Sequence, residues 1–235
     1  MKTTLITGTN RGIGLEMVRQ YAANGWHVLA TCRNPDRADA LQQIAHDSSG
    51  AVEIEPLDVT NPEEISALGN RWKDRTVDVL INNAGFYGDH MGSEPMKIGK
   101  IDYPLWTRTL AVNTLAPMAM VETFLESILR SKEKKIVTLS SRMGSVGDNT
   151  SGGSYLYRSS KAAINAVTKS LAIDLSSQGI IAVVLHPGWV LTDMGGPNAT
   201  LSTEASVRNM LQVITKLEAQ DNGRFLLHDG TELPW

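Results

Sequence analysis

Short segments rich in apolar and β-branched residues alternate along the chain with longer segments in which an apolar residue recurs every three or four positions. We predict that the longer segments are helices, as in Ile164, Val167, Leu171 and Leu175, because this spacing places the residues on one helix face. Strands that alternate with helices form a parallel sheet with helices on both faces. The predicted strands are residues 3–7, 27–32, 52–57, 77–81, 135–140, 180–185 and 224–227.

The predicted sheet lies at the centre of one domain. Segments 77–81 and 180–185 are apolar almost throughout and not only at every second residue, which indicates burial on both sheet faces. The chain has 235 residues, 42% of them hydrophobic, and this is enough to form a core without disulfides or a structural metal. No linker or internal repeat divides it, so we expect an α/β fold in a single domain.

Charge and cysteine content exclude several classes of protein. The net charge is −3 and no basic run lies at either end, so nucleic acid is not an expected partner. Cys32 is the only cysteine, which fits a reducing compartment and predicts a cytoplasmic location. We expect neither a membrane span nor a signal peptide. The five histidines are scattered and no cluster has ligand spacing, so we predict no metal site.

A glycine-rich loop follows the first predicted strand. Glycines let a strand turn sharply into a helix whose free N–H groups and positive dipole end face a pyrophosphate, with no Cβ in the way. A second strand follows within about 30 residues, as a dinucleotide-binding unit requires. We therefore predict a nicotinamide dinucleotide cofactor. The loop residues expected to bind it are Gly8, Asn10, Arg11, Gly12, Ile13 and Gly14.

The end of the second strand indicates which nicotinamide cofactor binds. An acidic residue there would pair with the ribose 2′-OH, but the strand ends in Cys32 and Arg33. Arg33 and Arg11 could together bind a 2′-phosphate in the bidentate manner of guanidinium groups. These residues favour NADP(H), and the nearby Asp36 keeps NAD(H) as the less favoured alternative.

Tyr157 and Lys161 lie four residues apart in a predicted helix and so share one face. An ammonium group beside a phenol stabilises the phenolate and lowers the pKa of the tyrosine. This pair predicts that Tyr157 is a usable proton donor near neutral pH.

The chain resembles the short-chain dehydrogenase/reductases in motifs that follow the family's order over nearly its whole length. They are Thr7-Gly8 to Gly14, Asp58-Val59, Asn82-Asn83-Ala84-Gly85, Asn113, Ser140-Ser141, Tyr157 to Lys161 and Pro187-Gly188. Within the family, residues 157–165, 186–196 and 229–235 are most similar to the C-factor and sniffer group of carbonyl reductases. The resemblance implies a doubly wound Rossmann-type sandwich with a seven-stranded, mainly parallel sheet. The cofactor half would be about 1–135, and the catalytic and substrate half about 136–235.

The resemblance also implies catalytic roles. Tyr157 would donate a proton to a substrate carbonyl, Ser141 would orient that oxygen, and Lys161 would lower the tyrosine pKa and hold the nicotinamide ribose. Asn113 would kink the long helix that we predict from about 106 to 129, and fix a water in a proton relay. Ser140 remains the alternative to Ser141, because side chains alternate along a strand and the 16 residues to Tyr157 exceed the usual family spacing. An insertion within 144–153 would explain that spacing.

Further cofactor contacts are implied by matched position. Asp58 and Val59 would flank the adenine; Asp58 could also cap a helix before Thr60, and the two roles are compatible. Gly188 and Thr192 would meet the nicotinamide amide. The remaining expected contacts are Asn83, Ala84 and Gly85 at the back of the cleft, with Tyr157, Lys161, Pro187 and Val190.

The loops after the strands carry large apolar side chains that we expect to line the substrate pocket: Phe86, Tyr87, Met91, Met143, Trp189 and Met194. They favour a small, apolar carbonyl substrate. The resemblance implies an NADP(H)-dependent oxidoreductase acting on a ketone, aldehyde or quinone. The alternative is an NADP(H)-binding signalling or sensor protein of C-factor type with little turnover. Family members often form a homodimer or homotetramer through the helix bearing Asn113 and the helix after Tyr157.

Overall fold

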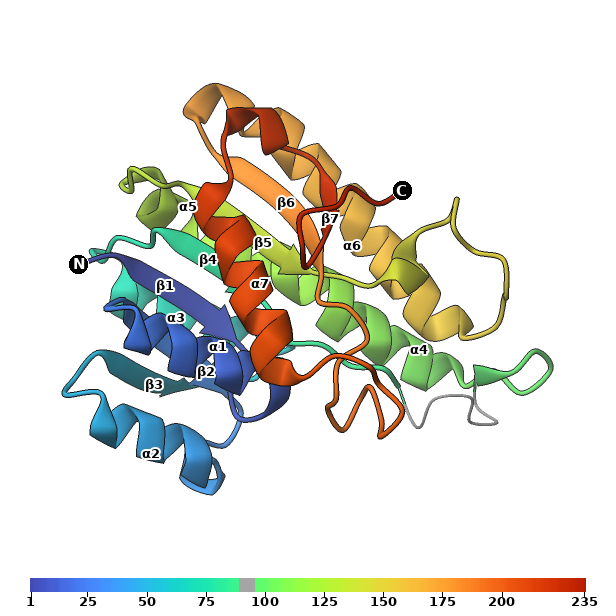
Figure 1. The fold of residues 1–235 in the computed structure, drawn as a ribbon, viewed down its shortest axis with the longest axis horizontal. Coiled ribbons are helices and arrows are strands. Elements are labelled where there is room, and N and C mark those ends of the chain that lie inside the picture. The colour runs from blue at the N-terminus through green and yellow to red at the C-terminus, as the bar shows by residue number, and fades with distance from the viewer. Residues whose placement is uncertain (89–95) are drawn as a thin grey trace.

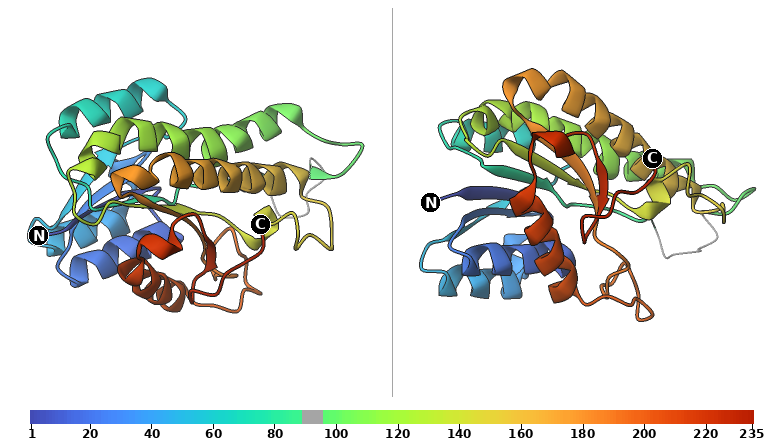
Figure 2. Two further views of the ribbon diagram at one scale, coloured as in Figure 1. Left: turned by 90° about the horizontal axis from the view of Figure 1, so that it is seen from above. Right: turned by 45° about the horizontal axis from the view of Figure 1, so that its top comes forward.

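A seven-stranded sheet lies between two layers of helices in the computed structural model, which describes residues 1–88 and 96–235 (Figures 1 and 2). The strands are β1 (Thr3–Thr7), β2 (His27–Cys32), β3 (Val52–Pro56), β4 (Val79–Asn82), β5 (Lys135–Leu139), β6 (Ile181–His186) and β7 (Phe225–Leu227). The α-helices are α1 (Gly12–Ala23), α2 (Asp39–Asp47), α3 (Pro62–Trp72), α4 (Tyr103–Leu110), α5 (Ala116–Leu129), α6 (Tyr155–Asp174) and α7 (Thr203–Lys216).

The strand order is β3-β2-β1-β4-β5-β6-β7, and all neighbouring strands are parallel. From β1 the chain moves outward to β2 and β3, then returns to β4 on the other side of β1. This doubly wound arrangement confirms the predicted fold class. Ligands of such sheets bind where the strand order reverses, outside the carboxyl ends of the strands, which here means beside β1 and β4.

Alternate strand residues enter two separate cores. Ile6 packs with Met17 of α1 and Met210 of α7 on one face of the sheet. Its neighbour Leu5 packs on the other face, with Phe124 of α5. Accordingly α1, α2 and α7 cover one face, while α3, α5 and α6 cover the other (Figure 2). Burial on both faces explains why the interior strands have no polar alternation.

Two element boundaries differ from the sequence-based expectation by two residues or more, whereas the other strand boundaries agree to within one residue. The fourth strand begins at Val79 and not at Val77, because the Val77 N–H donates to the Ser127 carbonyl at the end of α5 and not to a strand. The long helix begins at Tyr103, three residues before the predicted start. The Asp102 carboxylate caps this end by accepting the Leu105 N–H at 2.8 Å.

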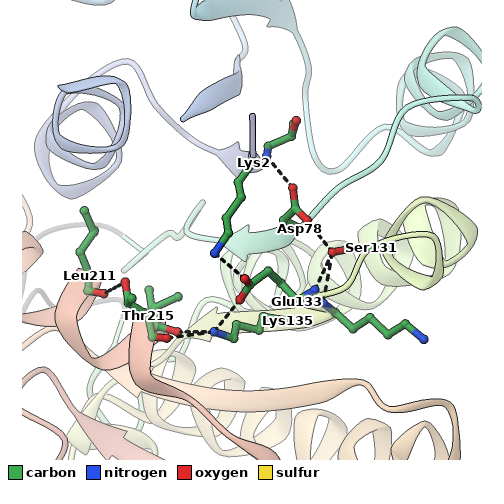
Figure 3. A network of polar contacts seen from close by, with 10 residues as sticks. Lys2, Asp78, Ser131, Glu133, Lys135, Leu211 and Thr215 are labelled. Carbon is green, nitrogen blue, oxygen red and sulfur yellow. Dashed lines mark hydrogen bonds and ion pairs between the residues drawn. The ribbon is translucent and has the colours of Figure 1, made fainter. Parts of the chain in front are cut away.

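The edge of the sheet where the strands begin is held by a polar network (Figure 3). The buried Lys135 ammonium donates to the carbonyls of Ile214 and Thr215 in the last turn of α7, at 3.0 and 3.2 Å. The ammonium also pairs with Glu133 at 3.0 Å, and Glu133 pairs with Lys2. The network therefore joins β5, the last turn of α7 and the start of the chain. Among the described helices, none is long and apolar enough to cross a membrane.

Candidate active site

The residues singled out in the sequence lie on segments that meet at the carboxyl ends of the strands. Figure 1 shows these strand ends and the loops and helix starts that follow them. Arg33 follows β2 and Asp58 lies two residues after β3. Asn83 follows β4, Ser141 lies just beyond β5, and Pro187 follows β6. Tyr157 and Lys161 come from the first turns of α6. The sheet therefore brings together segments that are widely separated in the chain.

The glycine loop packs against the end of β4 so closely that side chains would not fit. Gly8 has a φ of +71°, and a Cβ on it would lie 2.8 Å from the Ala84 Cα. A Cβ on Gly14 would overlap the Gly8 carbonyl oxygen and come within 2.5 Å of the Asn83 amide nitrogen. That amide donates to the carbonyls of Thr7 and Gly8 at 2.7 and 2.9 Å. The loop is therefore held in one shape by the end of β4.

Thr7 has a role that the sequence reasoning missed. Its hydroxyl oxygen accepts the backbone N–H groups of Asn83 and Ala84, at 3.1 and 3.0 Å. Thr7 ends β1 and is buried, and its side chain bonds across to the segment that follows β4. The sequence signal for this role was a small hydroxyl residue at the end of a strand, directly before the first glycine of the loop.

The first turn of α1 suits an anionic ligand. Its N-cap residue, Arg11, is extended and makes no side-chain cap, and no acidic residue lies in the first turn. By contrast, the Asn61 side chain caps α3 by accepting two backbone N–H groups. The free N–H groups of an uncapped helix, together with its positive dipole end, bind phosphate readily. The site thus fits the pyrophosphate of a dinucleotide, which Gly8, Gly12 and Gly14 let approach the backbone.

The two arginines expected at a 2′-phosphate are placed differently. Arg11 pairs with Asp193, on the loop after β6, at 2.7 Å, and both side chains are exposed. Arg33 lies close enough to Asp58 for its charge to act on that carboxylate. Arg11 must therefore leave Asp193 before it can join Arg33 at a phosphate, and exposed ion pairs of this kind are weak.

Asp58 forms a local turn and does not cap a helix. Its carboxylate accepts the Thr60 N–H at 2.9 Å and the Thr60 hydroxyl at 2.7 Å, whereas Asn61 caps α3. Burial alone would raise the pKa of the Asp58 carboxyl, but the Thr60 hydrogen bonds and the charges of Arg33 and Arg108 outweigh burial and lower it. Asp58 is therefore ionised at neutral pH, and its predicted contact with the adenine remains a prediction.

Tyr157 and Lys161 are both buried, with 7% and 5% of their surfaces exposed. Burial raises the pKa of the Tyr157 phenol above its usual value; the Ser141 hydrogen bond opposes this rise and the neighbouring Tyr87 adds to it. Burial also lowers the pKa of Lys161 to about 8. The Lys161 ammonium lies 5.7 Å from the centre of the Tyr157 ring and donates to the Leu139 carbonyl at 2.9 Å.

The expected depression of the tyrosine pKa by Lys161 is therefore wrong for this state of the chain. Burial dominates the Tyr157 phenol, while the Lys161 ammonium is directed to a strand carbonyl. A protonated Tyr157 is nevertheless the form that can donate a proton.

Ser141, and not Ser140, faces Tyr157. The Ser141 side chain lies close enough to the phenol to act on its pKa, whereas Ser140 is buried and its hydroxyl donates to the Lys161 carbonyl over a long 3.5 Å. Two successive residues at the end of a strand point to opposite sides, so only one could reach the phenol. The catalytic role of Ser141 remains a prediction.

Asn113 lies at a local change in helix type. Residues Ala111–Leu115 form a π-helical turn between α4 and α5, which agrees with the expected irregularity of this helix. The Asn113 amide donates to the Phe86 carbonyl at 2.7 Å and to the Ser160 hydroxyl at 2.9 Å, and its oxygen accepts the Phe86 N–H at 2.8 Å. Asn113 therefore holds the loop after β4 against α6. The proposed water relay stays a prediction.

The loop after β6 lies beside the glycine loop. Gly188 has a φ of +87°, and a Cβ on it would come within 2.9 Å of His228. Val190 is buried and pairs with Leu201 in an isolated bridge. The Thr192 methyl group would lie 3.4 Å from a Cβ on Gly12, so this loop touches the glycine loop directly. No three His, Cys, Asp or Glu side chains within residues 1–88 and 96–235 are grouped so that they could hold a metal ion.

An apolar cluster surrounds Tyr157. The Tyr87 ring lies against the Tyr157 ring with centroids 4.5 Å apart, and Met143 packs on the same cluster. Phe86 lies beneath the Arg108 guanidinium, while Trp189 and Met194 are exposed on the loop after β6. The expected wall residue Met91 lies outside the described residues. The sequence reasoning missed the other members of the cluster, which are Met96, Ile101, Leu105, Trp106 and Leu156. The apolar residues within 101–106 were a signal for three of them.

Comparison with known proteins agrees with this geometry. The sequence model of the short chain dehydrogenase family matches residues 2–201. The C-signal protein of Myxococcus xanthus is 45% identical over 159 residues, which is 68% of this chain and 93% of that protein. The carbonyl reductase Sniffer of D. melanogaster is 37% identical, with a TM-score of 0.91 and complete coverage of both chains. NADPH-bound carbonyl reductase from chicken fatty liver is 34% identical, with a TM-score of 0.90 and coverage of 100% and 99%.

Proposed function

The chain belongs to the short chain dehydrogenase family, and on this premise we propose that it is an NADP(H)-dependent carbonyl reductase of the cytoplasm. Its substrate would be an apolar ketone, aldehyde or quinone. The observation that carries the proposal is the placement of Ser141 beside the phenol of Tyr157, which is buried together with Lys161 at the carboxyl edge of the sheet. The resemblance to two carbonyl reductases over the full chain supports the reaction class.

The nicotinamide supplies or accepts the hydride when the cofactor is bound. In reduction Tyr157 donates its phenolic proton to the carbonyl oxygen, and Ser141 donates a hydrogen bond to the same oxygen. Two donors placed in advance stabilise the negative charge that develops there. The raised pKa of Tyr157 keeps its proton in place at neutral pH. The Lys161 ammonium, 5.7 Å from the centre of the Tyr157 ring, would stabilise the negative charge left on the phenolate after proton transfer.

The glycine loop and the open first turn of α1 would hold the pyrophosphate, and Arg33 and Arg11 the 2′-phosphate. The absence of a carboxylate directly after β2 supports NADP(H) over NAD(H). The cofactor half is about 1–135, and about 136–235 supplies the catalytic and substrate residues.

The test follows the absorbance of NADPH with a panel of ketones, aldehydes and quinones. Tyr157→Phe should lower kcat at least about 100-fold, because general acid catalysis contributes that much, and should leave NADPH affinity within about twofold. Tyr155→Phe is the matched control, because Tyr155 lies on the same helix and is 41% exposed. Retention of more than about a tenth of the activity in Tyr157→Phe would contradict the assigned proton donor.

We also propose that the protein forms a homodimer or homotetramer. Leu115 and Ile173 are exposed on the helical layer that bears α5 and α6, and Tyr103 is exposed at the start of α4. Burial of such apolar side chains supports association through this layer. Sedimentation of the wild type and of Leu115→Glu tests the proposal, and a monomeric wild type would contradict it.

A second candidate function is a signalling or sensor protein that binds NADP(H) with little turnover. The 45% identity to a protein named C-signal favours keeping it. NADPH binding without turnover of any compound in the panel would support this alternative over the reductase.

A further inference from the structure

The chain turns back on itself after β7. The Leu227 N–H donates to the Thr231 carbonyl at 2.7 Å, which closes a tight turn. The Leu233 N–H then donates to the Phe225 carbonyl at 2.7 Å, so the returning segment runs antiparallel along β7. Leu233 is buried there. This return carries Trp235 toward the loop that follows β5 (Figure 1).

Trp235 lies against the loop that begins at the candidate catalytic serine. Its main-chain oxygen accepts the Gly147 N–H at 2.9 Å and the Ser145 hydroxyl at 3.2 Å. Its indole ring packs on Phe225, with centroids 5.7 Å apart, and lies under the Lys169 ammonium at 5.6 Å. Trp235 is therefore held by its ring on β7 and α6, and it contacts the loop through its main chain.

The same loop packs on α6 on its other side. A Cβ on Gly144 would come within 2.8 Å of the main-chain carbonyl carbon of Lys161. The Gly144 carbonyl also accepts the Asn165 amide at 3.3 Å. Residues 142–147 therefore lie between the C-terminal segment and the helix that carries Tyr157 and Lys161.

The orientation of Ser141 depends on this loop. The Ser141 hydroxyl oxygen accepts the backbone N–H of Met143 at 3.2 Å while the hydroxyl also meets Tyr157. The Ser145 hydroxyl oxygen similarly accepts the Asp148 N–H at 3.0 Å. A shift of the loop backbone at Met143 would therefore rotate the Ser141 hydroxyl away from the phenol.

We propose that residues 233–235, which we name the C-terminal tail, are a positioning element for Ser141. The tail holds residues 142–147 against α6 through Ser145 and Gly147, and so keeps the Ser141 hydroxyl directed at Tyr157. Ser145 and Trp235 are positioning residues, since both act through Ser141. The inference rests on the proposed reductase function.

The test is a double-mutant cycle on kcat with NADPH and a carbonyl substrate. Ser145→Ala removes the hydroxyl that donates to Trp235, and Trp235→Ala removes the ring that holds the tail. We expect each to lower kcat about tenfold, which is part of the 10²- to 10³-fold loss caused by removing an oxyanion donor entirely. In a Ser141→Ala background each should lower kcat less than about twofold, because coupled residues are not additive.

Two variants serve as matched controls. Val146→Ala changes the residue between Ser145 and Gly147, whose side chain is 75% exposed, and should leave kcat within about twofold. Trp235→Phe keeps an aromatic ring on Phe225 and should restore most of the activity lost in Trp235→Ala. The dissociation constant of NADPH should change less than about twofold in every variant, because the tail acts on Ser141.

Amide hydrogen exchange of residues 142–147 provides a second measurement that needs no turnover. Exchange should be faster in Ser145→Ala and Trp235→Ala than in the wild type. Unchanged exchange, or an equal loss of kcat in the wild-type and Ser141→Ala backgrounds, would overturn the inference. A wild type that reduces no carbonyl compound would instead refute the proposed function, and exchange would still decide whether the tail holds the loop.

Discussion

At the scale of single residues, burial acts in opposite senses on the two titratable side chains of the candidate site. It raises the pKa of the Tyr157 phenol and lowers that of the Lys161 ammonium to about 8. In both cases burial favours the uncharged form, because neither charge is solvated by water. The proton donor is therefore kept protonated. The charged form of Lys161 lowers the free energy of unfolding, because burial removes its solvation by water.

The cost of burying Lys161 predicts a dependence of stability on pH. Below about pH 8 the lysine is protonated in both the folded and unfolded states, so the fold bears the full cost. Between about 8 and the unfolded value of 10.5 the folded state loses the proton first, and stability rises with pH. From pH 7 to 9.5 we expect the wild type to gain about 2 kcal/mol relative to Lys161→Met. Urea unfolding of both proteins across this range measures it, and parallel curves would contradict the assigned shift.

Cofactor choice is also decided by single residues. Arg33→Ala should weaken NADPH binding about tenfold to a hundredfold, because a hydrogen bond to a charged group is worth about 1.5–3 kcal/mol, and should leave NADH unchanged. Arg33→Asp should move the preference toward NADH. Asp193→Ala frees Arg11 from its ion pair and should tighten NADPH binding by up to about fivefold. The measurement is kcat/KM with each cofactor; a wild type that prefers NADH would refute the assignment.

At the scale of elements, the π-helical turn is what brings Asn113 to the site. The Ala116 N–H donates to the Ala111 carbonyl, five residues back. Pro117 has no N–H to donate to the Asn113 carbonyl, so an ordinary helical bond is impossible there. The turn is thus built into the sequence by a proline four residues after the asparagine.

Removing the Asn113 side chain should loosen the loop after β4. Asn113→Ala leaves the Phe86 N–H and carbonyl without their partners, and we expect a loss of about 3 kcal/mol in the free energy of unfolding. Asn82→Ala is the matched control, since Asn82 is equally buried but donates only one long bond, 3.4 Å to the Pro117 carbonyl. It should cost about 1 kcal/mol or less. Equal losses of unfolding free energy in the two variants, measured with denaturant, would show that the Asn113 contacts stabilise the fold no more than the Asn82 bond does.

At the scale of the whole molecule, the edge where the strands begin and the edge where they end have different roles. The candidate site occupies the edge where the strands end, and the Lys135 network holds the edge where they begin (Figure 3). Most of the strands have five or six residues, which sets these edges about 17 Å apart. Changes at one edge should therefore affect stability without affecting the chemistry at the other.

Lys135→Met tests this separation. The change removes the ammonium that bonds the last carbonyls of α7 and the Glu133 carboxylate, so we expect a loss of about 2 kcal/mol in stability. The kcat/KM should stay within about twofold of the wild type. Lys2→Met is the control, because its exposed ion pair with the same Glu133 is worth less than about 1 kcal/mol. A large fall in kcat/KM for Lys135→Met would show that the edges are coupled.

The sequence by itself determined the seven strands and the glycine loop, and it named residues that the fold brings to the carboxyl ends of the strands. Apolar periodicity is local, and it reports which faces of a segment are buried. The positive φ of Gly8 and the missing N–H of Pro117 are also properties of single residues that can be recognised in the sequence. The strand at 79–82 was misplaced by two residues because a bond from Val77 to the end of α5 decided its start.

Only the tertiary structure decided which partners these residues have. It turned Ser141 toward Tyr157, paired Arg11 with Asp193 182 residues away, and set Trp235 against the loop after β5. It also reversed the expected shift of the tyrosine pKa, because that shift depends on burial. Contacts across the sheet form only when distant segments pack together, and the same packing decides how far a side chain is removed from water. The spacing of residues along the chain therefore predicts neither.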